Sequence, residues 1–199
     1  SQAAQHGLSL AQYKIGEFFE LGKGSLAISE EQALRFYSES AKKELPIALC
    51  KMGVFWESGK AGLQASDENA LPFYSLAAEK GFSHAQYRMG EFWQSGKAGL
   101  PASDEKALAF YVQAAEQGHR FAQYRMGEFW EWGKAGLQAS DEKALLYYLE
   151  AAEQKMPEAQ CHVGRYWEEG LAGLSPSDTK ALKYYQAAAD GGVCNAQYK

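Results

Sequence analysis

The chain has 199 residues, of which 46% are hydrophobic and 14% aromatic, and it carries a formal net charge of −5. This aromatic content, together with only five prolines, excludes a disordered chain. The acidic balance argues against nucleic acid as a partner, because proteins neutralise phosphates with Lys and Arg. No apolar run approaches the roughly 20 residues of a membrane span. The sequence does not assign a compartment, so cytoplasmic and periplasmic or secreted locations both stay open.

A repeat of 37 residues accounts for nearly the whole chain. Alanine recurs at this interval from Ala11 to Ala196. In chain order we predict the tail of an earlier repeat, five full repeats and the start of another, at residues 1–10, 11–47, 48–84, 85–121, 122–158, 159–195 and 196–199. Solenoids need terminal repeats with a polar outer face, and neither end supplies one. We therefore expect the chain to be part of a longer array.

Each repeat predicts two helices joined by a loop, as the third repeat illustrates. Its first helix begins at Ala85, has apolar residues at helical spacing, and ends at Gly96. A loop over residues 97–102 leads to Ser103, which is placed to cap a second helix that closes at Gly118. The other repeats have serine in the same capping position, at Ser29, Ser66, Ser140 and Ser177.

A glycine inside each predicted first helix implies close packing. Gly90 costs about 1 kcal/mol relative to alanine in a helix interior, so its recurrence in every repeat requires a compensating contact. We expect the paired second helix to approach this glycine, with Ala107 or Ala114 facing it. Stacked helix pairs then share one continuous core, since a single pair is too small to bury its own apolar face.

The pattern resembles that of the Sel-1-like repeat family, a relative of the tetratricopeptide repeat. Tetratricopeptide units run 34 residues, and the three additional residues here lie in the loop between the helices. The resemblance implies an all-α, α/α superhelical solenoid of helix-turn-helix repeats that acts as an adaptor, with the first helices lining a concave face for a protein or peptide partner. In the third repeat it rests on Ala85, Met89, Gly90, Trp93, Gly96, Asp104, Lys106, Ala107, Phe110, Tyr111, Ala114, Ala115, Gly118 and Ala122.

The predicted binding surface consists of first-helix positions that vary between repeats, because the constant positions build the scaffold. Trp132 is the clearest candidate anchor, since aromatic residues dominate interface hot spots. Packing of Trp132 on a neighbouring helix is the alternative. The other candidates on this surface are His84, Arg88, Glu91, Phe121, Arg125, Glu128, Arg165 and Glu169.

Charged residues recur along the predicted first helices. The fourth position of the repeats reads Lys14, Lys51, Arg88, Arg125 and His162. Three of these basic residues precede a glutamate by three positions, which predicts solvated helix pairs worth about 0.3 kcal/mol each. The alternative is a stripe that binds an acidic peptide or a C-terminal carboxylate. An acidic series on the same helices suggests charge-matched protein recognition; it reads Glu20, Glu57, Gln94, Glu131 and Glu168.

The sequence contains no motif for catalysis, metal binding or cofactor binding. Cys50 and Cys161 lie three repeats apart, on the order of 30 Å by stacking distance, whereas a disulfide needs Cα atoms within about 7 Å. We expect both to be buried thiols, and Cys194 has no obvious mate. The prediction is a protein-interaction scaffold and not an enzyme. A dedicated inhibitor or immunity-type protein that binds one bacterial effector is the first alternative, and a small-molecule binder or enzyme is the second.

Overall fold

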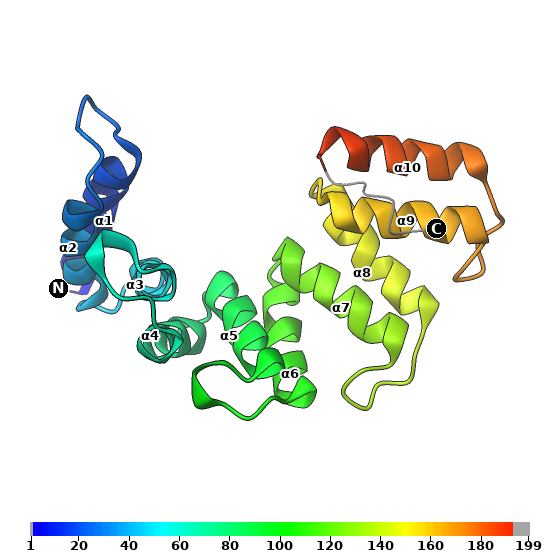
Figure 1. The fold of residues 1–199 in the computed structure, drawn as a ribbon, viewed down its shortest axis with the longest axis horizontal. Helices are drawn as coiled ribbons and strands as arrows, with labels where there is room; N and C mark the ends of the chain where they lie inside the picture. Colours follow the sequence, from blue (N-terminus) through cyan, green and yellow to red (C-terminus); the bar gives the residue numbers. More distant parts are fainter. Residues whose placement is uncertain (1, 193–199) are drawn as a thin grey trace. The chain divides into compact units, whose positions relative to one another are not determined.

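The computed structural model describes residues 2–192, and within them every regular element is helical (Figure 1). Two short 3-10 helices, Lys60–Gly62 and Lys97–Gly99, lie in loops. The ten α-helices of this range are α1 Gln2–Leu21, α2 Glu30–Ala41, α3 Pro46–Ser58, α4 Asp67–Glu79, α5 Ser83–Ser95, α6 Asp104–Glu116, α7 Arg120–Trp132, α8 Asp141–Glu153, α9 Pro157–Glu169 and α10 Asp178–Asp190. The all-α prediction is confirmed.

The helices form two compact units, one up to Ser103 and one from Asp104 onward. In the first unit α1 packs on α2 and α3 on α4, and the pairs are joined by the contacts of α2 with α3 and of α4 with α5. In the second unit α7 packs on α8 and α9 on α10, while α6 contacts α7 and α8 contacts α9. Each unit is therefore a stack of helix pairs, as expected for a solenoid.

The helix ends follow the sequence signals. The hydroxyl of a serine accepts a hydrogen bond from the backbone N–H three residues on at the start of α2, α4, α8 and α10, which confirms the predicted caps Ser29, Ser66, Ser140 and Ser177. A glycine in the left-handed conformation ends α3, α5, α7 and α9, at Gly59, Gly96, Gly133 and Gly170. These two signals fix the length of the loop within each repeat.

The N-terminal helix includes most of the residues assigned to the tail of an earlier repeat, an assignment that stays a prediction. Helix α1 runs without a break from Gln2 through Gly7 to Leu21, so the described part of residues 1–10 continues the first helix of the next repeat. At the other end, Cys194, Asn195 and the expected repeat start at residues 196–199 lie outside the described residues.

The glycine inside each first helix faces a tyrosine ring. A Cβ added at Gly53 would lie 2.6 Å from the ring of Tyr74, and one added at Gly127 would lie 2.5 Å from that of Tyr148. Gly16 and Gly164 face Tyr37 and Tyr185 in the same way. In these four repeats the glycine therefore meets a tyrosine ring and not an alanine, while the contact of Gly90 with Ala107 or Ala114 stays a prediction. The missing side chain makes room for an aromatic ring, which buries more apolar surface than an alanine does.

Three of these tyrosines, Tyr37, Tyr74 and Tyr148, also link their repeat to the next one within a unit. Their rings contact an aromatic residue of the following first helix, with centroids 5.6 Å apart for Tyr37 and Phe55 and 6.0 Å apart for Tyr148 and Tyr166. All four of these side chains have no exposed surface. The core of each unit is thus continuous across repeats. Among the described helices, none combines the length and the apolar character that crossing a lipid bilayer requires.

Candidate protein-binding surface

One face of every first helix carries the positions that vary between repeats. They follow spacings of four, three and four residues, which places them on one side of an α-helix. We refer to each set of four as the variable stripe of its helix. The stripes are Leu10, Lys14, Glu17 and Leu21 on α1; Ile47, Lys51, Val54 and Ser58 on α3; His84, Arg88, Glu91 and Ser95 on α5; Phe121, Arg125, Glu128 and Trp132 on α7; and Glu158, His162, Arg165 and Glu169 on α9.

Trp132 projects into solvent at the end of α7. Its exposed fraction is 65%, whereas the other four tryptophans of the chain are half-buried. The alternative that Trp132 packs on a neighbouring helix is therefore wrong. Phe121, at the start of the same stripe, is half-buried against the core of the second unit, and the Arg120 guanidinium lies 4.8 Å from its ring centroid. Phe121 thus supports the scaffold from the same face that presents Trp132.

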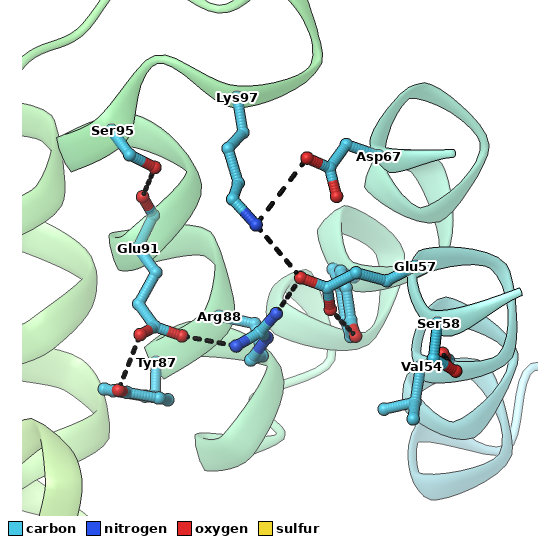
Figure 2. A network of polar contacts seen from close by, with 10 residues as sticks. Val54, Glu57, Ser58, Asp67, Tyr87, Arg88, Glu91, Ser95 and Lys97 are labelled. Atoms are coloured by element: carbon cyan, nitrogen blue, oxygen red, sulfur yellow. Dashed lines mark hydrogen bonds and ion pairs between the residues drawn. The ribbon is translucent and has the colours of Figure 1, made fainter. Parts of the chain in front are cut away.

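The expected ion pairs along single helices are present. Arg88 binds Glu91 at 2.6 Å on α5, and Arg125 binds Glu128 at 2.8 Å on α7. Lys14 and Glu17 make the corresponding pair on α1. Tyr87 adds a hydrogen bond to Glu91, as Figure 2 shows. These groups remain accessible at the surface, so each pair can also meet the charges of a partner.

The acidic residues at the tenth position of the repeats join one repeat to the next. Glu57 of α3 accepts hydrogen bonds from Tyr74 at 2.9 Å, from Lys97 at 3.2 Å and from Arg88, and Lys97 also lies 3.6 Å from Asp67 (Figure 2). Burial opposes ionisation of the Glu57 carboxyl, but the bond from Tyr74 and the charge of Arg88 outweigh it and lower the pKa. We call this cluster the Glu57 node.

The Glu20 node repeats this arrangement one repeat earlier. The carboxylate of Glu20 accepts bonds from Tyr37 at 2.6 Å, from Lys51 at 2.8 Å and from Lys60 at 3.4 Å. Lys51 and Lys60 belong to the next repeat, so the node ties the two repeats together. Part of the charged series predicted to recognise a partner therefore also holds the stack together. The sequence did not reveal this use because the bonded residues lie in different repeats.

The Glu131 node in the second unit has different partners. Tyr148 donates to Glu131 at 2.6 Å, and Arg165 of the next repeat binds the same carboxylate. His162 lies 3.6 Å away, stacked on the Tyr148 ring and within 3.3 Å of the Tyr124 hydroxyl. Burial lowers the pKa of His162 to about 4, which leaves the ring neutral at pH 7. The prediction that His162 continues the basic series is therefore wrong.

The nine predicted partner-binding residues fall on the stripes of three helices. His84, Arg88 and Glu91 lie on α5 in the first unit, and the remaining six lie on α7 and α9 in the second. Glu169, the last residue of α9, has a side chain that is half exposed and lies 3.8 Å from Arg165. Sequence reasoning missed a pocket of about 240 Å³ beside the stripe of α3. Its signal was the loss of the repeat consensus at Cys50 and Val54.

The described residues offer no clear reaction centre. Within residues 2–192, no three His, Cys, Asp or Glu side chains are grouped to hold a metal ion. Cys50 and Cys161 are buried free thiols, as predicted.

Comparison with known proteins decides the family. The Sel1 repeat matches five consecutive segments, at residues 9–45, 46–82, 83–119, 120–156 and 157–193. The chain belongs to the Sel1 repeat family. Sel1 repeat proteins generally act as scaffolds for protein interactions and are typically not catalytic. No curated protein is significantly similar to the chain.

Solved structures share this fold. A Sel1 repeat protein from Oxalobacter formigenes is 26% identical, with a TM-score of 0.83 over 93% of this chain and 74% of the other. The immunity protein PA5088 from Pseudomonas aeruginosa is 20% identical, with a TM-score of 0.61 over 93% and 70%. The protective antigen c5321 of uropathogenic Escherichia coli, which has the same type of fold, is 22% identical, with a TM-score of 0.51; this chain covers 48% of it.

Proposed function

We propose that this Sel1 repeat chain is an interaction scaffold that binds one protein or peptide partner across its first-helix faces, with Trp132 as the main contact. The observation that carries the proposal is the 65% exposure of Trp132 on the variable stripe of α7. Burial of the large apolar surface of this ring against a partner is favourable, and tryptophan is enriched among the hot spots of interfaces.

The charges around Trp132 support recognition of a specific partner. The Arg125–Glu128 pair lies on the same stripe of α7, and Arg165 and Glu169 lie on the stripe of α9. Charge pairs at the rim of an interface contribute more to specificity and association rate than to affinity. A partner with alternating charges around one apolar contact fits this surface. In the first unit, the stripe of α5 offers His84, Arg88 and Glu91 for the same purpose.

A dedicated inhibitor of one bacterial effector is the second candidate function. Two solved structures with this fold are immunity proteins of Pseudomonas aeruginosa, each about 20% identical to the chain. An inhibitor would use the same surface, but it would hold a single toxin very tightly, whereas a scaffold would hold one or a few other proteins. The number and affinity of captured proteins separate the two functions, and a small-molecule binder or enzyme would retain none.

Affinity capture with matched variants tests the proposal. We expect Trp132→Ala to lower affinity for the captured partner about 30-fold, or about 2 kcal/mol, which is typical of an interface hot spot. Leu146→Ala is the control, because Leu146 is also exposed (62%) but lies on a second helix of the same repeat. Its affinity should stay within about twofold of the parent chain. Equal losses for the two variants, or a large fall in melting temperature for Trp132→Ala, would contradict the proposed surface.

A further inference from the structure

A pocket of about 240 Å³ lies beside the variable stripe of α3 in the first unit. It is smaller than the usual site for a drug-sized ligand, and its size suits one side chain of a partner. Three helices of consecutive repeats and the residue that precedes α5 contribute to its wall, so it belongs to the first-helix side of the stack. The lining residues are Tyr13, Ile47, Cys50, Lys51, Val54, Phe82 and His84.

The pocket exists where the second repeat departs from its neighbours at two positions. In the first and third repeats the third position is a tyrosine that bonds the glutamate at the seventh position, with Tyr13 3.1 Å from Glu17 and Tyr87 2.7 Å from Glu91. The second repeat has Cys50 and Val54 at these two positions. A ring and a carboxylate are thus replaced by two small apolar groups, which leaves a hollow with an apolar floor.

The same replacement changes the charge next to the hollow. Basic residues of the first and third repeats have a glutamate three positions on, whereas Lys51 has Val54 there. Among the residues that line the pocket, Lys51 carries the one full charge at pH 7, and the lining contains no carboxylate. Burial and the charge of Arg88 lower the pKa of His84 below its ordinary value, which keeps its ring neutral.

The node that holds Lys51 also carries an excess of positive charge. In the Glu20 node the Lys51 and Lys60 ammonium groups share one carboxylate, while Glu30 accepts from the backbone N–H of Ala61. In the Glu57 node two cations meet three carboxylates, those of Glu57, Asp67 and Glu91. A further carboxylate would therefore meet less repulsion in the first of these two nodes, where two cations share one carboxylate. Glu20 would keep its bonds from Tyr37 and Lys60 while Lys51 turned to the newcomer.

We propose that this pocket binds a peptide segment of the partner protein in which a bulky aliphatic side chain stands next to an aspartate or glutamate. The aliphatic group fills the hollow between Ile47, Cys50 and Val54, and the neighbouring carboxylate binds Lys51. The proposal rests on the scaffold function above and specifies which chemistry one part of the surface recognises. No covalent step is involved, because burial raises the pKa of the Cys50 thiol to about 12 and keeps it protonated.

Differential selection from a random dodecapeptide display library tests the pocket. The variant Cys50→Tyr/Val54→Glu gives the second repeat the pair that the third repeat has at Tyr87 and Glu91. It therefore fills the hollow with two residues that occur together at the same positions of a neighbouring repeat. Peptides that bind the parent chain but not this variant should be enriched in Leu, Ile or Met next to Asp or Glu. Identical selections for both chains, or enrichment of basic peptides, would overturn the proposal. A thermal melt of the variant establishes that it folds.

A charge variant keeps the test informative if the filled variant does not fold. Lys51→Gln leaves the hollow open, and it should weaken a selected synthetic peptide at least tenfold in a fluorescence polarisation titration, with the loss reduced when salt is raised to screen the charge. Replacing the acidic residue of that peptide by its amide should weaken binding to the parent chain equally and have little effect on Lys51→Gln. An equal loss with both chains would overturn the role of Lys51.

Failure of the pocket and failure of the scaffold function are distinguishable. Trp132→Ala changes the second unit, so it should leave the affinity of the selected peptide within twofold while lowering capture of the whole partner. If the selected peptides bind the parent chain and Cys50→Tyr/Val54→Glu equally well while Trp132→Ala still abolishes capture of the partner, the pocket proposal is wrong and the scaffold proposal stands. If Trp132→Ala has no effect on capture but the peptides bind the parent chain and not Cys50→Tyr/Val54→Glu, the pocket proposal is supported and the Trp132 surface is wrong.

Discussion

The Glu57 and Glu131 nodes both join one repeat to the next, but they use different residues. Each places a glutamate at the tenth position of a repeat against a buried tyrosine of the second helix and a cation of the next repeat. In the first unit the cation is Arg88, at the fourth position, assisted by the loop residue Lys97. In the second unit the cation is Arg165, at the seventh position, and the residues that correspond to Arg88 and Lys97 are not cations.

The difference shows that the node specifies where a charge lies and leaves open which residue provides it. Arg165 starts one helical turn beyond the position of Arg88 and reaches the equivalent carboxylate. His162 takes the vacated fourth position as a neutral ring stacked on Tyr148, with centroids 4.4 Å apart. Leu171 stands where all four preceding repeats have a loop lysine. The Glu131 node is thus drier and depends on a single cation, which makes it the more vulnerable of the two.

The largest expected effect is the loss of the Glu131 carboxylate. The Glu131 side chain is 7% exposed and that of Glu57 is 19% exposed. Glu131→Gln leaves the Arg165 charge without its main partner in a buried site, so we expect it to lower the free energy of unfolding by about 3 kcal/mol. Glu57→Gln should cost about 1 kcal/mol, because Arg88 keeps Glu91 and Lys97 keeps Asp67. Urea titrations of the two isosteric variants measure the difference, and equal losses would contradict it.

The neutral histidine predicts a smaller effect that depends on pH. The pKa of His162 is about 4 in the folded chain and about 6.5 in an unfolded one, so the unfolded state binds the extra proton between these values. Stability that is fully present above pH 6.5 is therefore lost as the pH falls toward 4. The groups around the ring are Glu131, Arg165, Tyr124 and Tyr148, and burial outweighs the attraction of Glu131. Between pH 7 and pH 5 we expect a loss of about 2 kcal/mol.

His162→Gln is the control for this pH dependence. The variant lacks the titrating ring, so the part of the stability change between pH 7 and pH 5 that comes from His162 should disappear. The carboxylates of the molecule titrate in both chains, and their contribution cancels in the comparison. An unchanged pH profile in His162→Gln would show that folding leaves the pKa of His162 near its value in the unfolded chain, which would contradict the neutral, buried ring.

Local signals in the sequence were sufficient for the scaffold. A serine followed by an acidic residue begins α2, α4, α8 and α10. A glycine ends α3, α5, α7 and α9. The pairs Arg88–Glu91 and Arg125–Glu128 were also predictable, because residues three apart on a helix must be neighbours. The period of 37 residues then placed the corresponding helices from α2 to α10. These features depend on interactions within about four residues along the chain.

The interactions between repeats could not be read in the same way. Arg88 and Glu57 are 31 residues apart and Arg165 and Glu131 are 34 apart, so no helical spacing connects them. His162 resembled a basic residue because it stands in a basic column, and only its burial shows that it is neutral. The pocket beside Val54 arises from two substitutions on one helix and from residues of two other repeats. Only packing brings these together.

The smallest expected effect comes from converting one node into the other. The double variant His162→Arg/Arg165→Glu gives the fifth repeat the residues of the third, Arg88 and Glu91, at the same positions. His162→Arg alone places two cations against Glu131, and Arg165→Glu alone adds a carboxylate beside it with no cation near, so each single change should destabilise the chain. In the double variant the new arginine can bind both carboxylates, as Arg88 does. We expect its unfolding free energy to lie within about 1 kcal/mol of the parent chain, with a coupling of about 2 kcal/mol between the two changes. If the two effects simply add in a double-mutant cycle, the position of the cation matters as well as its charge, and the two nodes are not equivalent.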